Sequence, residues 1–264
     1  MRLRTRTTRR VATAGLVLAT ATALTACTTD NNDGGIDSTA DGQDSSEVRT
    51  SAPEAEDALP PDAELVLAEG EAPGGGVVQV IDPELLQEAV DKLVADQSRQ
   101  LMENPACDKV SRLETVSNHA TTDGVTAAVR YKQAEDDDTE HRFGIGMVDH
   151  RLDEFLDRAL YEACTESQSS ANPNVRLFMY VEDAPPVEGA EGFKVISDFV
   201  TTDPDGAASI SRAIAIHGFA RDTTVSVEYA ARGDDPEVDP VLPTADGALN
   251  AIYTAQMEKI LNAD

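Results

Sequence analysis

The chain has 264 residues, of which 49 are acidic and 21 basic, and its formal net charge at pH 7 is −28. A surface this negative repels phosphate groups, and nucleic-acid binding requires clustered lysine and arginine. The composition therefore argues against DNA or RNA as a partner, and it is compatible with a solvated surface outside the cell.

The N-terminus consists of a basic segment followed by an apolar one. Five arginines lie within the first ten residues, and residues 11–26 carry no charge, a run too short to span a bilayer stably. The run leads into Leu24-Thr25-Ala26-Cys27. This order of parts resembles the lipobox of bacterial lipoproteins, in which diacylglycerol is attached to the cysteine and cleavage leaves that cysteine as the new N-terminus.

The resemblance implies a signal peptide at residues 1–26, lipidation of Cys27 and attachment to the extracytoplasmic face of the cell membrane. Two or three acyl chains hold a protein on a membrane almost permanently, because each buried methylene contributes about 0.8 kcal/mol. The alternatives are an uncleaved membrane anchor and an ordinary secretory peptide that ends near a cysteine. Thr8-Arg9-Arg10 leaves the choice between Sec and twin-arginine export open.

Residues 27–76 are predicted to form an acidic, disordered tether. Between Thr28 and Gly76 there are thirteen acidic residues and a single basic one, Arg49. Such a segment buries too little apolar surface to offset its conformational entropy. Within it, Leu65-Val66-Leu67 is expected to be a short strand or a docking segment ahead of a glycine hinge at Gly74–Gly76.

Residues 77–264 are long enough to form one domain with its own core. The first predicted element is a helix, for which Asp82 is a good N-cap and Pro83 suits the first helical position. Apolar residues recur at helical spacing as far as Val94, and Asn104-Pro105 predicts the end of the helix.

Alternation and turn chemistry predict the remaining elements. Strands are expected at Lys109–Val116, Val125–Tyr131, His141–Val148, Val175–Val181, Phe193–Thr201, Ser209–Phe219 and Thr223–Ala230. Turns are expected at Thr122–Gly124, Asp203–Gly206 and Ala220–Asp222, and further helices at Asp149–Cys164 and Ala245–Asn262. This order predicts an α+β fold, with a curved antiparallel sheet of about six to seven strands and three helices.

The order of elements is similar to that of the extracytoplasmic sensor-type domains of high-GC Gram-positive bacteria, which occur as lipoproteins and on receptor serine/threonine kinases. The similarity rests on the paired cysteines, on Val225-Ser226-Val227-Glu228-Tyr229 in the late hairpin and on Gln256-Met257-Glu258-Lys259 in the last helix. It implies a sensor-like domain that binds a protein, small-molecule or lipid ligand.

The cysteines are informative once Cys27 is assigned to the lipid. Cys107 and Cys164 remain, in a compartment where thiols oxidise, and we expect them to form a structural disulfide. Their spacing fits neither Cys-x-x-Cys nor a zinc site, and no histidine lies within four residues of either.

The sequence contains no recognisable catalytic motif. It lacks a nucleophile elbow, Ser-x-x-Lys, a P-loop, a dinucleotide fingerprint and His-Glu-x-x-His. The acidic run at Glu135–Asp138 lacks the alternating ligands of a calcium loop, and the four histidines are scattered. We therefore predict no catalytic, metal or cofactor residues and a non-catalytic binding function. The alternatives are a lipid-carrying lipoprotein with an apolar cavity and a cell-wall hydrolase that uses paired carboxylates.

Overall fold

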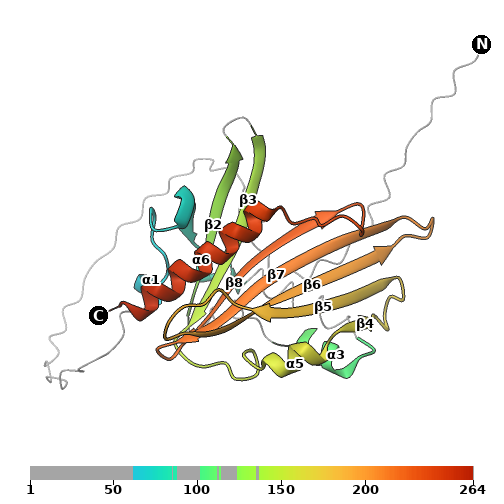
Figure 1. Cartoon of the computed structure of the whole chain (residues 1–264), viewed down its shortest axis with the longest axis horizontal. Helices are drawn as coiled ribbons and strands as arrows, with labels where there is room; N and C mark the ends of the chain where they lie inside the picture. The colour runs from blue at the N-terminus through green and yellow to red at the C-terminus, as the bar shows by residue number, and fades with distance from the viewer. Residues whose placement is uncertain are drawn as a thin grey trace, which may run out of the picture.

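The structure is a computed structural model that describes residues 62–84, 86–87, 102–111, 113, 124–134 and 137–263. Its framework is one open antiparallel sheet with the strand order β1-β2-β3-β8-β7-β6-β5-β4 (Figure 1). The strands are β1 (Val77–Val80), β2 (Gly124–Ala134), β3 (Asp137–Val148), β4 (Glu166–Gln168), β5 (Val175–Asp183), β6 (Glu191–Thr202), β7 (Ala208–Ala220) and β8 (Thr223–Gly233). The helices are α1 (Asp62–Leu65), the 3-10 turn η2 (Pro73–Gly75), α3 (Pro105–Ser111), α5 (Arg158–Ala163) and α6 (Pro243–Leu261).

The α+β class and the antiparallel sheet are confirmed, with eight described strands instead of six to seven. Six of the seven predicted strands are present, as β2, β3 and β5 to β8. The strands that were not predicted, β1 and β4, form the two edges and have four and three residues. Segments this short carry almost no alternation for a sequence pattern to reveal, and short edges limit pairing with other chains.

The long strands β6, β7 and β8 pair through consecutive hairpins. Arg221 and Asp222, at the β7–β8 turn, both have positive φ, which is the backbone of a tight two-residue hairpin turn. The β6–β7 turn closes through hydrogen bonds between Asp203 and Gly206 and between Asp203 and Ala207. Both turns confirm the prediction.

One face of the sheet is covered by α6. The larger core lies between them, and its fully buried members include Phe143, Ile145 and Ile216 from the strands and Ile252 and Met257 from the helix. Alternate side chains along the strands point toward this layer, and most of them are apolar. The predicted final helix is confirmed, beginning two residues earlier at Pro243.

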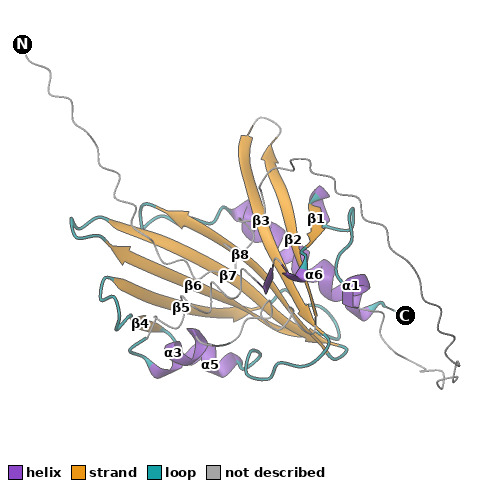
Figure 2. Ribbon diagram, turned by 180° about the vertical axis from the view of Figure 1, so that it is seen from behind, coloured by secondary structure: helices purple, strands orange, loops and turns teal. Residues whose placement is uncertain are grey.

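The opposite face packs against α3 and α5 near the β4 edge (Figure 2). A second core forms there around Leu177, Phe193 and Tyr161. The Sγ atoms of Cys107, in α3, and Cys164, which caps the C-terminus of α5, are joined in a disulfide, so the predicted pairing is confirmed. The bond ties together two short helices that the strand contacts alone would hold weakly.

The packed structure begins earlier than the predicted boundary at Val77. Leu65, Val66 and Leu67 are all buried in the larger core. The buried side chain of Gln256 in α6 accepts a hydrogen bond from the Leu67 amide at 3.0 Å and donates one to the Leu65 carbonyl at 2.8 Å. Residues 62–76 therefore belong to the domain, and Leu65-Val66-Leu67 is a docking segment. Because the residues around these three are mostly acidic or small, the composition of the segment did not reveal that three apolar side chains pack into the core.

Two predicted elements differ in the structure. Lys109–Val116 was predicted to be a strand, but α3 occupies residues up to Ser111, because Pro105 begins a helix and Asn104 accepts a hydrogen bond from the Ala106 amide at its start. The helix predicted at Asp149–Cys164 is reduced to α5, with Asp157 as its N-cap.

Other predictions fall wholly or partly outside the described residues. Residues 83, 84, 86 and 87 are helical, and the Asp82 side chain accepts a hydrogen bond from the Glu84 amide, as expected for a helix beginning at Pro83. Residues 85 and 88–101 of that helix lie outside, whereas Met102, near its predicted end, forms an isolated β-bridge with Ser169 and is not helical. Also outside are residues 112 and 114–116 of the first predicted strand, residues 122–123 of the first predicted turn, the leader with Cys27, and residues 28–61.

Candidate functional site

A cavity of about 460 Å³ lies between the β5–β6 connection and α6. Most of its lining side chains are small or aliphatic, but polar atoms make up at least half of the surface that the lining exposes; the lining residues are Ala184, Pro185, Pro186, Val187, Glu188, Ala190, Gly192 and Tyr253. Two consecutive prolines stiffen this connection, because each proline ring fixes its own φ. The volume falls within the range of ~300–1,000 Å³ that is typical of small-molecule sites.

Tyr253 is placed over a depression in the sheet made by two glycines. Gly192 of β6 and Gly218 of β7 are directly paired in the sheet register. A Cβ atom on either glycine would collide with the Tyr253 hydroxyl, at 2.6 Å in the case of Gly218. The absence of two Cβ atoms therefore lets the phenol lie flat on the sheet, with its hydroxyl against Gly192 at the wall of the cavity.

The Tyr253 hydroxyl opens onto the cavity and has no hydrogen-bond partner among the described residues. The residue as a whole is 1% exposed, but its hydroxyl is not one of the described side-chain atoms that are both fully buried and without a partner, which are Thr126 Oγ1, Arg130 Nε and Asn250 Oδ1. Burial raises the pKa of Tyr253 to about 12, because the phenolate would be poorly solvated. The group thus stays protonated and is a hydrogen-bond donor at every physiological pH.

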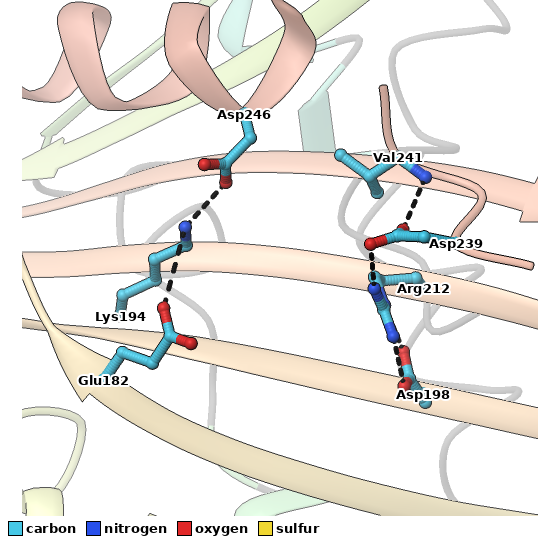
Figure 3. A network of polar contacts seen from close by, with 7 residues as sticks. All are labelled: Glu182, Lys194, Asp198, Arg212, Asp239, Val241 and Asp246. Carbon is cyan, nitrogen blue, oxygen red and sulfur yellow. Dashed lines mark hydrogen bonds and ion pairs between the residues drawn. The ribbon is translucent and has the colours of Figure 1, made fainter. Parts of the chain in front are cut away.

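Two cations on this side of the sheet, Lys194 and Arg212, are engaged by acidic side chains (Figure 3). Lys194 Nζ lies 2.6 Å from Asp246 Oδ1 in α6 and 3.9 Å from Glu182 Oε2 in β5. Lys194 is itself buried, so Asp246 both neutralises it and ties the start of α6 to the sheet. This lysine is therefore not available to a ligand in the cavity.

A second ion-pair group lies farther along the same face. Arg212 of β7 contacts both oxygens of Asp198 of β6, at 2.6 and 2.7 Å, and reaches Asp239 at 2.7 Å. Asp239 in turn accepts a hydrogen bond from the Val241 amide in the segment before α6 (Figure 3). These carboxylates raise the pKa of Arg212, chiefly through the Asp198 hydrogen bonds. These ion pairs explain why a charged residue, Arg212, interrupts the otherwise apolar face of β7.

On the other face, a buried histidine, serine and glutamate form a chain of hydrogen bonds. The Ser226 hydroxyl donates to Glu228 Oε1 at 2.9 Å, so the contact of 3.2 Å between Ser226 Oγ and His217 Nδ1 requires a protonated Nδ1. In a catalytic triad the histidine lies between the serine and the carboxylate and accepts the serine proton. Here serine is central and donates to the carboxylate, so the arrangement does not activate a nucleophile.

The surroundings of His217 keep its ring uncharged. Phe155, Tyr161 and Phe193 pack against it, with ring centroids 4.1, 5.5 and 5.4 Å away. Burial lowers the pKa of His217 to about 3. The His217 ring is therefore part of the buried core, where its Nδ1 atom is hydrogen-bonded to Ser226 Oγ.

Acid should destabilise the protein through His217. In the unfolded chain this histidine binds a proton below about pH 6.5, whereas in the folded protein it does so only near pH 3. The contribution of the uncharged His217 ring to the free energy of unfolding is thus complete above pH 6.5. It is lost as the pH falls, by up to about 1.4 kcal/mol per pH unit. Between pH 7 and pH 4.5, the free energy of unfolding measured with urea should fall by about 2–3 kcal/mol more in the wild type than in His217→Asn, because asparagine does not titrate. His150→Asn, at an exposed site, is the control and should behave like the wild type; equal losses in all three proteins would contradict the prediction.

The structure brings together only part of what the sequence suggested. Cys107 and Cys164 are bonded, whereas Cys27 lies outside the described residues. His141 contacts the Tyr229 hydroxyl and His150 contacts Asp149. Within the described ranges, no group of three or more histidine, cysteine or carboxylate side chains is placed to hold a metal ion.

Nothing in the sequence pattern singled out Tyr253 as a candidate site residue, since it lies within the predicted final helix Ala245–Asn262 like any other residue of that helix. The available signal was Gly218, an isolated glycine within the predicted strand Ser209–Phe219, which often marks the close approach of another group; Gly192 lies just before the predicted strand Phe193–Thr201. Without the strand register, nothing connected these glycines with Tyr253.

Comparison of the chain with protein-family models, with curated proteins and with solved structures finds no match. Among the helices that the structure describes, none combines the length and the apolar character needed to cross a membrane.

Proposed function

We propose that the chain is a bacterial lipoprotein, anchored at Cys27 on the extracytoplasmic face of the cell membrane, whose domain binds a ligand without catalysing a reaction. The observation that carries the anchoring is the lipobox-like Leu24-Thr25-Ala26-Cys27 after a basic and apolar leader. The disulfide supports it independently, because such bonds persist mainly outside the cytoplasm. The acidic segment from position 28 to 61 would then hold the domain about 30–35 Å from the membrane, as a flexible chain of that length does on average.

The binding part of the proposal is supported by the cavity at Tyr253. It has the size of a ligand site, and Tyr253 is one of its lining residues. The non-catalytic part is supported by the order of contacts in the buried His217–Ser226–Glu228 chain, which supplies no activated nucleophile.

Substituting Cys27 should release the protein from the membrane. In the native host, Cys27→Ala is expected to move most of the protein from the membrane fraction to the soluble fraction, because no acyl chain can then be attached. Immunoblotting of separated fractions measures this, and Thr28→Ala is the matched control that keeps the cysteine. A membrane fraction unchanged by Cys27→Ala would remove the anchoring part of the proposal.

A further inference from the structure

We propose that the open edge of β1 binds an extended, basic segment of a partner protein, which adds to the sheet as a further strand. The inference goes beyond the proposed function and does not use the cavity at Tyr253. It rests on three properties of β1: backbone groups that face away from the sheet, exposed apolar side chains, and a surrounding stretch of chain that is acidic throughout.

The backbone of β1 has hydrogen-bonding groups that no neighbouring strand uses. β1 is the outermost strand, next to β2 (Figure 2). The Ile81 amide donates to the Thr126 carbonyl of β2 at 2.8 Å, and the register is continuous from there back to Val77. Because successive residues of a strand turn their N–H and C=O groups to opposite sides, those of Val78 and Val80 face away from β2. They have no hydrogen-bond partner among the described residues, so two donors and two acceptors are available to another strand.

The opposite edge of the sheet is closed by the chain itself. Beyond β4, Met102 forms a bridge with Ser169, and the Glu103 amide donates to the Gln168 carbonyl at 3.0 Å. Natural edges that are not covered in this way are commonly protected by charged residues, proline or a bulge. β1 contains no charged residue and no proline, and its register with β2 has no bulge. The protein therefore covers one edge and leaves the other accessible.

The side chains of β1 suit a partner strand. Val77 is 48% exposed and Val80 51%, and they are two of the five large apolar side chains that are exposed among the described residues. Since they are three positions apart, they point to opposite faces of the sheet. A strand beside β1 would thus cover apolar surface on both faces, while its backbone supplies the hydrogen bonds. The four residues of β1 limit this contact to a short segment.

The charges along this part of the chain favour a basic segment. Residues 62–84 contain six acidic residues and no basic one. Asp82 and Glu84, which follow β1, are exposed and form no ion pair with a described residue. Lysine or arginine at the ends of a bound segment would find counter-charges there. A second copy of this chain is a poorer occupant, because each copy carries a formal net charge of −28 and the two repel each other.

The test uses the blocked peptide Lys-Lys-Val-Thr-Val-Thr-Val-Lys-Lys and the full chain carrying Cys27→Ala, which removes the lipid acceptor. Binding is measured by fluorescence anisotropy of the labelled peptide, and we expect this peptide to bind. One control peptide has glutamate in place of each lysine. The other carries N-methyl groups on its three central amides, which block hydrogen bonding along both of its edges. Each control should bind more weakly by about tenfold or more.

Two substitutions of one residue connect binding with the edge of β1. Val80→Pro removes the outward N–H group, and it should weaken peptide binding by about fivefold or more, within the range of one neutral hydrogen bond. Val80→Thr keeps the N–H group and the branched side chain and should bind like the parent protein. An edge strand tolerates proline where the missing N–H faces solvent. Both variants should therefore unfold close to the temperature of the parent protein, so that a loss of binding cannot be attributed to misfolding.

A second pair of variants tests the charges. Asp82→Asn combined with Glu84→Gln should weaken binding of the lysine peptide by about threefold or more. Asp203→Asn combined with Asp205→Asn removes the same number of charges at the β6–β7 turn and should change little.

Hydrogen exchange locates the bound peptide on the sheet. The peptide should slow the exchange of the Val78 and Val80 amides most, because these gain a hydrogen bond. It should slow the Gln79 amide least, since that group already faces β2.

Several outcomes would overturn the inference. Equal binding of the N-methylated peptide, or unchanged exchange of the Val78 and Val80 amides, would show that no strand is added at β1. Equal binding of the glutamate peptide would reject a basic partner. A dimer seen by sedimentation and dissociated by Val80→Pro would replace the partner with a second copy of the chain. If no peptide binds, the inference fails, whereas membrane retention through Cys27 tests the anchoring separately.

Discussion

Replacing Arg212 by leucine should lower the free energy of unfolding by about 3–5 kcal/mol. Asp198 is 5% exposed, and its two oxygens receive hydrogen bonds from Arg212. Removing the guanidinium leaves a carboxylate inside the protein with no counter-charge in contact with it, which is one of the most costly changes a core can undergo. The segment before α6 should loosen as well, because Asp239 is held by the same arginine.

Urea unfolding at pH 7 measures this loss, and two further variants isolate its cause. Asp198→Leu combined with Arg212→Leu removes both charges and should recover most of the stability. Arg176→Leu, on β5, breaks the exposed pair with Glu166 of β4 and should cost about 0–1 kcal/mol. If Arg212→Leu were as mild as Arg176→Leu, the ion pair would contribute nothing to stability.

Removing the disulfide is the second change with a large expected effect. Cys107 and Cys164 are separated by 57 positions, and both are fully buried. In the chain-entropy model, opening a loop of this length lowers the free energy of unfolding by about 4 kcal/mol, and measured values are commonly about 2–4 kcal/mol. The double variant Cys107→Ala/Cys164→Ala should therefore unfold at a clearly lower urea concentration than the oxidised protein.

The reduced wild type is the natural control, since it loses the bond and keeps both side chains. Hydrogen exchange should also locate the damage. The amides of α3 and α5 should exchange faster, whereas those of α6, on the other face of the sheet, should change least. Identical urea midpoints for the oxidised and reduced proteins would show that the bond does not stabilise the fold.

The parts of the fold that were predictable are those in which one periodicity persists over many residues. β6, β7 and β8 have eleven to thirteen residues each, with turn residues between them, and α6 has nineteen. The predicted bounds agree with the structure to within about three residues there. Lys109–Val116 was mispredicted because a seven-residue helix contains only two turns, and Pro105 at its start was interpreted as the end of the preceding element.

The disulfide and the candidate site differ in how much the sequence reveals. The disulfide was predictable by elimination, since Cys27 was assigned to the lipid and two cysteines remained. The cavity depends on the pairing of Gly192 with Gly218 and on the position of α6 across that pair, neither of which is a local property. The role of Gln256 in holding Leu65–Leu67 was hidden for the same reason, because the hydrogen-bonded groups are 189 and 191 positions apart.

The docking of Leu65–Leu67 on α6 has a mechanical consequence. A pull that arrives along the chain from the N-terminal side meets this segment before any strand of the sheet. The load falls first on the amide of Gln256 and on the Lys259 ammonium, which donates to the Val66 carbonyl at 2.8 Å. Gln256 is one turn along α6 from Tyr253. Tension between an anchored N-terminus and the domain would therefore reach the helix that forms one wall of the cavity. The Cys107–Cys164 disulfide lies on the opposite face of the sheet, away from this path.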